Sequence, residues 1–247
     1  MMSFDHDKVT PLSDSDLTKK QQVADMFDSI AHKYDFLNRF LSAGIDKSWR
    51  KKALRELKDI APQNILDLAT GTADVAIMAE KMYHPQKITG IDISDGMLEI
   101  GRKKIAALQL SSKIELINGD SEKIPFEDNS FEAVTVAFGV RNFSYLTIGL
   151  AEILRVLKPG GKLVVLEFSK PQASLIKPFY SLYMEHIAPW VGKTFSKNKA
   201  AYQYLNESIK NFPEGEKFTQ ILKQTGYSNV QRKPLSMGIC TIYCGQK

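Results

Sequence analysis

The sequence of 247 residues predicts an α/β protein with a doubly wound, seven-stranded, mostly parallel sheet, N-terminal helices and a helical cap insertion. Three observations predict this fold. From Asn64 onward, short runs rich in β-branched residues alternate with helical stretches of about ten to fifteen residues. The predicted strands are apolar on both faces, as in a parallel sheet that helices cover on both sides. Only residues 234–238 join the last two predicted strands, so these two should pair as an antiparallel hairpin at the sheet edge.

The predicted elements follow one another in the order of right-handed βαβ units. Before the sheet, apolar residues recur at helical spacing over residues 17–57. We expect strands at residues 65–69, 87–92, 114–119, 133–138, 162–168, 229–232 and 239–245. We expect helices between them at residues 73–83, 96–108, 146–157 and 214–225. The Pro-Gly-Gly sequence at residues 159–161 predicts a turn that ends a helix and begins the fifth strand.

The chain is expected to have a short flexible N-terminus followed by a single domain. Residues 1–16 are acidic and polar, which predicts flexibility. Residues 17–247 form the domain, with N-terminal helices over residues 17–60 and an insertion over residues 169–211 that interrupts the alternation. The insertion is rich in aromatic residues, so we expect it to wall a substrate site, to form a core for cap helices, or both. Its His186 has the intrinsic pKa of a general base, although a histidine beside apolar residues is more commonly a packing residue.

The composition, with 43% hydrophobic and 25% charged residues, is typical of a soluble globular protein. No apolar stretch approaches the ~20 residues of a membrane-spanning helix, and the N-terminus lacks a secretory or transit pattern, so we expect a cytoplasmic protein. Cys240 and Cys244 should be free thiols, and with four scattered histidines we expect no metal site. The net charge of +5 permits an anionic partner, but the basic runs are short and we expect no nucleic acid.

A nucleoside site is predicted where the first two strands end. A compact loop through Gly71 and Thr72 turns directly into a helix, so backbone N–H groups can face a ligand. Asp92 ends the second strand twenty-one positions after Gly71, where a carboxylate can accept both hydroxyl donors of a ribose. The alternative is an ordinary strand-to-helix turn. Ala69 and Ala73 stand where a dinucleotide-binding loop has glycines, which disfavours a pyrophosphate ligand.

Asp120 and Ser121 follow the third strand, where an aspartate can accept a hydrogen bond from an adenine amino group or cap the next turn. Taken in order with the Pro-Gly-Gly turn, these elements resemble class I S-adenosylmethionine methyltransferases, whose fold is a Rossmann-like sheet. The resemblance implies that the first loop approaches the methionine part of the cofactor and that Asp67 orders this loop. It also implies that Asp92 holds the ribose and that Asp120 and Ser121 meet the adenine.

Four further motifs lie outside the nucleoside site. They are FDSIA with YD and N in residues 27–38, FGVRNF in 138–143, LEFSKP in 166–171, and YQYL, ESI and FP in 202–213. Together they are similar to the demethylmenaquinone and ubiquinone C-methyltransferase family, over nearly the whole chain from Val23. The resemblance implies S-adenosylmethionine as cofactor and a prenylated quinol as substrate, with demethylmenaquinol converted to menaquinol. The alternatives are C-methylation of a benzoquinol in ubiquinone synthesis, methylation of RNA or protein, and a cofactor-binding subunit without activity.

Arg141 and Asn142 are the predicted catalytic residues. A hydroquinone carbon is a weak nucleophile until a ring hydroxyl ionises, and a phenol has an ordinary pKa of about 10. Arg141 can stabilise the phenolate and polarise a water, but its guanidinium stays protonated and cannot be the base. Asn142 can hold that water or a quinol oxygen. The alternative for Arg141 is an ion pair with a carboxylate at the sheet edge, and Tyr34 can either cap the cofactor or staple a helix.

A prenylated substrate resides in the membrane, so we expect peripheral contact of the enzyme with the membrane surface through Lys and Arg side chains. A homodimer is compatible with the sequence, which specifies neither the length of the prenyl tail nor the oligomeric state.

Overall fold

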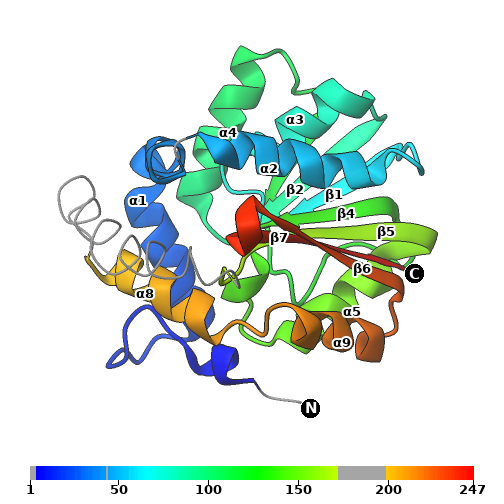
Figure 1. The fold of residues 1–247 in the computed structure, drawn as a ribbon. Helices are drawn as coiled ribbons and strands as arrows, with labels where there is room; N and C mark the ends of the chain where they lie inside the picture. The colour runs from blue at the N-terminus through cyan, green and yellow to red at the C-terminus, as the bar shows by residue number, and fades with distance from the viewer. Residues whose placement is uncertain (1–3, 43, 172–198) are drawn as a thin grey trace.

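The computed structural model describes residues 4–42, 44–171 and 199–247, and it contains a seven-stranded sheet between two layers of helices (Figure 1). The strand order is β3-β2-β1-β4-β5-β7-β6, and β7 runs antiparallel to both of its neighbours. The strands are β1 (Asn64–Leu68), β2 (Lys87–Asp92), β3 (Ile114–Asn118), β4 (Phe131–Ala137), β5 (Leu157–Phe168), β6 (Ser228–Leu235) and β7 (Cys240–Gln246). This topology confirms the predicted fold, including the antiparallel final hairpin.

Helices cover both faces of the sheet because side chains along each strand alternate between them. On one face, α2, α3 and α4 pack on Ile65 and Ile88; on the other, α5 and α9 pack on Leu66 and Leu68 (Figure 1). The helices are α1 (Lys19–Leu41), α2 (Ile45–Leu54), α3 (Asp74–Tyr83), α4 (Asp95–Ala107), α5 (Leu146–Val156), α8 (Lys199–Asn211) and α9 (Glu216–Thr225). Short 3₁₀ helices are η1 (Asp5–Lys8), η2 (Arg55–Leu57), η3 (Val140–Asn142) and η5 (Ser236–Gly238).

The fifth strand begins earlier than the sequence predicts. The expected start was residue 162, whereas β5 already pairs with β4 at Leu157. The register shifts between Phe131 and Ala133, and Gly160, with φ of +78°, lies in the irregular part. The Pro-Gly-Gly turn therefore forms a bulge inside the strand rather than a boundary before it.

The first helix starts with a capping box, since the Thr18 side chain accepts a hydrogen bond from the Gln21 amide and the Gln21 side chain accepts one from the Thr18 amide. Helix α1 packs along α8, with Val23 and Met26 in a small hydrophobic cluster that also contains Tyr204 (Figure 1). This cluster is separate from the two cores on the faces of the sheet, so α1 and α8 form a layer beside the carboxyl ends of the strands.

Residues 5–8, within the segment predicted to be flexible, form the 3₁₀ helix η1, which packs against the domain. His6 in η1 is fully buried, its ring lies edge-on to Phe212 with centroids 6.0 Å apart, and its carbonyl accepts a hydrogen bond from Lys19. Burial lowers the pKa of His6 to about 4. The contact with Phe212 joins residues far apart in the sequence, which local composition cannot predict.

Residues 172–198, with His186 and most of the predicted cap, lie outside the described residues. Within the described ranges, no helix is long and apolar enough to cross a bilayer. Cys240 and Cys244 are free and buried, as predicted, and burial raises the pKa of both thiols.

Candidate cofactor and substrate site

A pocket opens at the carboxyl ends of β1, β2, β3 and β4, where open α/β sheets bind ligands. Its wall combines apolar strand ends with carboxylates and with one face of α1. The lining residues are Lys20, Val23, Phe27, Leu68, Ala69, Ile91, Asp92, Ile93, Gly119, Asp120, Ser121, Glu122, Gly139, Asn142, Phe143 and Ser144. The structure thus brings together Asp92, Asp120, Ser121 and Asn142 of the predicted site residues.

The Asp92 carboxylate joins the loops that follow β1 and β2. One oxygen accepts the Gly71 amide at 2.8 Å, and the other accepts the Ser94 amide at 3.0 Å. Gly71 has φ of +55°, a conformation that glycine adopts without strain. Burial raises the pKa of Asp92. Each carboxylate oxygen has a further lone pair, so Asp92 can still accept hydroxyl donors from the pocket.

Asp67 lies behind the pocket rather than on its wall. It is 1% exposed, and its two oxygens accept hydrogen bonds from the hydroxyls of Thr70 at 2.7 Å and Thr135 at 2.6 Å. Burial raises the pKa of Asp67 to about 6. This geometry supports the expected role of Asp67 in ordering the loop, not a direct contact with a ligand.

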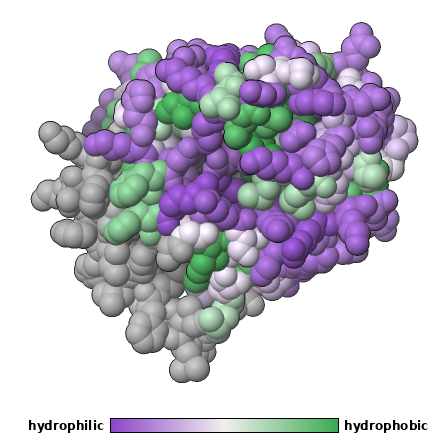
Figure 2. Space-filling view, turned by 90° about the horizontal axis from the view of Figure 1, so that it is seen from above, coloured by the Kyte–Doolittle hydropathy of each residue, from purple (hydrophilic) through white to green (hydrophobic). Residues whose placement is uncertain are grey.

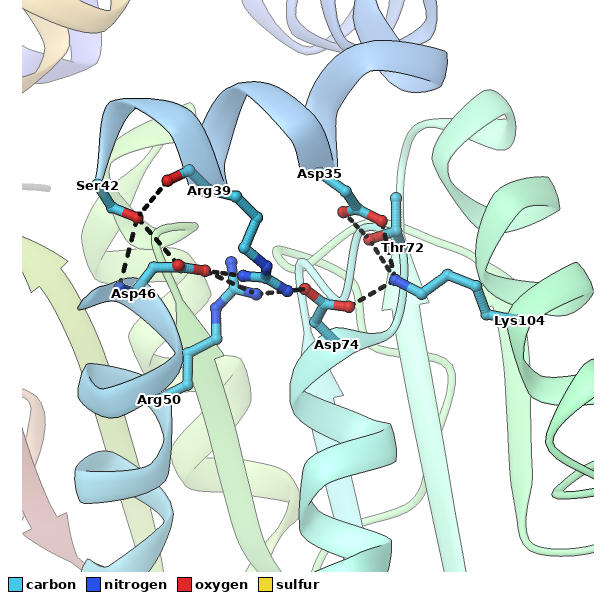
Figure 3. A network of polar contacts seen from close by, with 8 residues as sticks. All are labelled: Asp35, Arg39, Ser42, Asp46, Arg50, Thr72, Asp74 and Lys104. Carbon is cyan, nitrogen blue, oxygen red and sulfur yellow. Dashed lines mark hydrogen bonds and ion pairs between the residues drawn. The ribbon is translucent and has the colours of Figure 1, made fainter. Parts of the chain in front are cut away.

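Thr72 belongs to a polar network that ties the first loop to α1, α2 and α4 (Figure 3). Its hydroxyl donates to Asp35 at 2.6 Å and accepts from Lys104 at 3.1 Å. Arg39 and Arg50 donate to Asp74, the first residue of α3, at 2.7 and 2.6 Å. Thr72 is 2% exposed, so its side chain holds the loop in place from the side away from the pocket.

The network controls the ionisation of Asp74. Burial alone would raise the pKa of this carboxyl, but the charges of Arg50, Lys104 and Arg39 outweigh it and lower the pKa to about 2. Asp46 completes the network with ion pairs to Arg39 and Arg50 (Figure 3). At neutral pH the start of α3 therefore carries a fixed negative charge, which also suits the helix dipole.

Helix α1 lies across the pocket and bonds to three strand ends. Lys20 donates to Asp120 at 2.5 Å, near the end of β3. Asp28 accepts from the Ser94 hydroxyl at 2.5 Å and from the Gly96 amide at 2.8 Å, after β2. With the bond from Thr72 to Asp35 after β1, these contacts make α1 a cover over the three loops.

Asp120 caps the turn after β3 and also lines the pocket, while its contact with an adenine amino group stays a prediction. It lines the pocket beside Ser121, and its second oxygen accepts the Glu122 amide at 2.9 Å, which stabilises the turn. The Lys20 ammonium group donates to the other Asp120 oxygen. An adenine amino group would therefore bind a carboxylate whose negative charge is already partly balanced by Lys20.

Arg141 lies in η3, three residues after Phe138, which follows the end of β4 and has a strained backbone. Phe138 has φ of +60°, which is uncommon for a bulky side chain. The Arg141 guanidinium donates to the Phe138 carbonyl at 2.6 Å and to Glu167 at 2.7 Å, and it lies 5.5 Å from the Phe168 ring centroid. Glu167 is fully buried. The ion pair with a sheet-edge carboxylate is therefore present, and a further catalytic role for Arg141 stays a prediction.

Sequence reasoning missed several residues that build the site. Lys20 and Lys104 were not singled out, and Glu167 stood in the LEFSKP motif without a role, although a glutamate inside the apolar fifth strand indicates a buried ion pair. Asp28 and Asp35 stood in a quoted motif without a role. Their partners lie between 37 and 69 positions away, so spacing alone could not identify these pairs.

The sequence of the chain is similar to those of known methyltransferases. A model described as the ubiE/COQ5 methyltransferase family matches residues 15–247. The demethylmenaquinone methyltransferase of Bacteroides fragilis is 46% identical over 246 residues, which cover 100% of both chains. The ubiquinone/menaquinone biosynthesis C-methyltransferase UbiE of Geotalea daltonii is 45% identical over 94% of this chain and 99% of that protein.

Solved structures with lower identity share the fold. An S-adenosylmethionine-dependent methyltransferase of Thermotoga maritima superposes with a TM-score of 0.60 at 17% identity, covering 90% of this chain and 99% of that one. Phosphoethanolamine N-methyltransferase 2 of Haemonchus contortus, in complex with S-adenosyl-L-methionine, has a TM-score of 0.57 at 18% identity and covers 80% of this chain and 52% of that one.

The family match and the full-length relatives identify an S-adenosylmethionine-dependent methyltransferase, and the fold agrees with this class. The chain belongs to the ubiE/COQ5 methyltransferase family. The residues present fit the cofactor, because Asp92 has free acceptor capacity for ribose hydroxyls and Ile91 and Ile93 provide apolar surface. In addition, the Asn142 amide oxygen in the pocket has no hydrogen-bond partner among the described residues. The contacts of Gly71, Asp92, Asp120 and Ser121 with the cofactor, and the roles of Asp67 and Thr72 in ordering the loop for it, stay predictions.

Replacing Asp67 by Asn should stabilise the protein at neutral pH. The pKa of Asp67 rises from 3.8 in the unfolded chain to about 6 in the fold, so the folded state binds more protons and wild-type stability falls as pH rises from about 4 to 6. Asp67→Asn removes this loss, which is worth about 2–3 kcal/mol above pH 6, and should leave stability unchanged below pH 4. Thermal unfolding from pH 4 to 8 measures the effect. Asp128→Asn, at a side chain 68% exposed, is the control and should change Tm by less than about 2 °C. A pH-independent difference between Asp67→Asn and wild type would contradict the assignment.

Proposed function

We propose that this enzyme transfers a methyl group from S-adenosylmethionine to a ring carbon of a prenylated quinol, converting demethylmenaquinol to menaquinol. The observation that supports it most is the buried Arg141–Glu167 pair, set among aromatic residues beside the nucleoside pocket. The relatives named demethylmenaquinone methyltransferase and ubiquinone/menaquinone biosynthesis C-methyltransferase support the same reaction. The second name also makes a benzoquinol the second candidate substrate.

The chemistry requires stabilisation of a phenolate. One terminal nitrogen of Arg141 is held by Glu167 and the Phe138 carbonyl, which fixes the plane of the guanidinium. The Arg141 Nε atom has no hydrogen-bond partner among the described residues, so it can donate to a developing phenolate. Asn142, on the same 3₁₀ turn, lines the pocket and can accept the quinol hydroxyl or hold a water that takes its proton.

The alignment of the quinol with the cofactor and the exclusion of water from the site provide the rest of the catalysis. Methyl transfer needs the ring carbon in line with the sulfur–methyl bond, so a fixed geometry contributes more than any single group. Val23 and Phe27 of α1, together with Phe143, give the pocket an apolar side that suits a flat ring. RNA or protein methylation is less well supported, because residues 138–143 form a largely apolar loop around one arginine rather than a basic or polar surface.

Turnover with quinols tests the proposal. Purified protein with labelled S-adenosylmethionine should methylate demethylmenaquinol, with the benzoquinol precursor, RNA and protein assayed in parallel. Arg141→Ala should lower kcat by about 10²–10³ while the Kd for S-adenosylhomocysteine stays within about twofold. Since Glu167 would then be buried without its partner, the double variant Arg141→Ala/Glu167→Gln separates catalysis from stability.

Arg232→Ala is the matched control, because Arg232 is 41% exposed on β6 and should leave kcat unchanged. Wild-type turnover in the double variant would remove Arg141 from the mechanism. A wild-type chain that methylates RNA or protein and no quinol would contradict the proposed substrate class.

We further propose that the enzyme works in the cytoplasm at the membrane surface, where its substrate resides. Phe36, Phe40 and Ile45 are 52%, 51% and 46% exposed, and the two phenylalanine rings stack 5.9 Å apart. Exposed Lys47 and Lys51 follow on α2, a combination that suits an anionic bilayer. The face in Figure 2 is mostly hydrophilic, with small apolar areas among the polar side chains. The expected homodimer stays a prediction.

Flotation with vesicles tests the membrane contact. The wild type should float with vesicles that contain anionic lipid, more weakly at high salt, and Phe36→Ser/Phe40→Ser should reduce the bound fraction several-fold. Leu108→Ser, a single exposed apolar residue on the C-terminal side of α4, is the control. Equal flotation of wild type and double variant would contradict this contact surface.

A further inference from the structure

Several buried polar atoms without a hydrogen-bond partner gather around η3. Among the described residues, Arg141 Nε, Asn142 Oδ1 and Ser144 Oγ lack a partner, and so does the hydroxyl of Tyr204 on α8, which packs against η3. Buried polar atoms in proteins are nearly always paired, and each orphan costs about 1–3 kcal/mol. Four of them, two on η3, one just after it and one on the neighbouring α8, indicate that a polar ligand completes this region.

Tyr204 lies on the helix that packs against η3, the 3₁₀ turn that carries Arg141. Its side chain is 4% exposed and shares a hydrophobic cluster with Val23, which lines the pocket. Burial raises the pKa of Tyr204, so the hydroxyl keeps its proton at neutral pH and remains available as a donor.

Other buried tyrosines show what a structural hydroxyl does in this fold. The Tyr227 hydroxyl donates to the Leu150 carbonyl at 2.9 Å, and the Tyr243 hydroxyl accepts the Gly215 amide at 2.7 Å. Both hydroxyls stabilise backbone groups. Within the part of the chain that the structure describes, the Tyr204 hydroxyl stabilises no such group, so packing alone would be served equally well by phenylalanine.

We propose that Tyr204 is a further catalytic residue, whose hydroxyl donates a hydrogen bond to the quinol oxygen that becomes a phenolate, opposite the Arg141 guanidinium. This inference rests on the proposed function and names a second donor in the same site. Tyr204 keeps its proton throughout, while the quinol proton leaves to water held at Asn142. Two donors on one oxygen lower the pKa of the bound quinol and favour attack by the ring carbon on the methyl group. The sulfur–methyl bond breaks and releases S-adenosylhomocysteine. The methylated carbon then loses its C–H proton to water and the oxygen regains a proton, which restores the aromatic quinol.

The test compares Tyr204→Phe with Tyr227→Phe. Tyr204→Phe removes an unpaired hydroxyl, so its Tm should be unchanged or higher and its Kd for S-adenosylhomocysteine should stay within about twofold. Its kcat with demethylmenaquinol at pH 7 should fall about ten- to hundredfold. The pH of half-maximal kcat should move upward, because a quinol with one donor fewer ionises at higher pH. Tyr227→Phe should lower Tm and keep the wild-type kcat and pH profile.

The outcomes separate this inference from the proposed function. An active wild type with an equally active Tyr204→Phe and an unshifted pH profile would contradict the inference alone. A fall in the Tm of Tyr204→Phe without a change in the pH profile would assign the hydroxyl a structural role and would also contradict it. A wild-type chain that methylates no quinol would contradict the proposed function, and this inference with it.

Discussion

The site depends on the two hydrogen bonds that the Asp92 carboxylate accepts. By accepting the amides of Gly71 and Ser94, it joins the loops after β1 and β2 into one rim at the carboxyl edge of the sheet. Parallel strands bring these loops together whatever their sequence, but only a carboxylate at this position can bond to both amides and still accept donors from a ligand. The nucleoside pocket follows from this single residue and from the topology around it.

A second set of contacts places α1 over this rim. The helix belongs to a hydrophobic cluster separate from the two sheet cores, yet it bonds to all three loops through Lys20, Asp28 and Asp35, and the Asp74 network anchors its far end (Figure 3). Several of these groups are charged and partly buried, so the cost of removing them from water offsets much of their attraction. They therefore contribute more to the position of α1 than to the stability of the fold. The result is a pocket with a polar rim for the nucleoside and an apolar side toward η3. This division suits a methyl donor on one side and a flat aromatic acceptor on the other.

The sequence predicted the order of elements well, because helical and strand periodicities are local properties. The positions of Asp92, Asp120 and Asn142 on the pocket wall also followed from the sequence, since strand ends of a parallel sheet meet at one edge. Three features did not follow. The ion pair of Arg141 was only an alternative, because its partner Glu167 was not identified from the sequence. The network around Thr72 joins side chains from four helices. His6 is buried against Phe212, which directly follows α8. Each depends on contacts between distant segments, which no local pattern encodes.

Titration calorimetry of S-adenosylhomocysteine with wild type and Asp92→Ala tests the central claim most directly. Removing the carboxylate deletes both predicted ribose acceptors and frees the Gly71 and Ser94 amides, so we expect the Kd to rise at least about a hundredfold, with circular dichroism showing an intact fold. Glu115→Ala, at a side chain 55% exposed on β3, should bind as the wild type does. A folded Asp92→Ala that binds S-adenosylhomocysteine within twofold of the wild-type Kd would contradict the account.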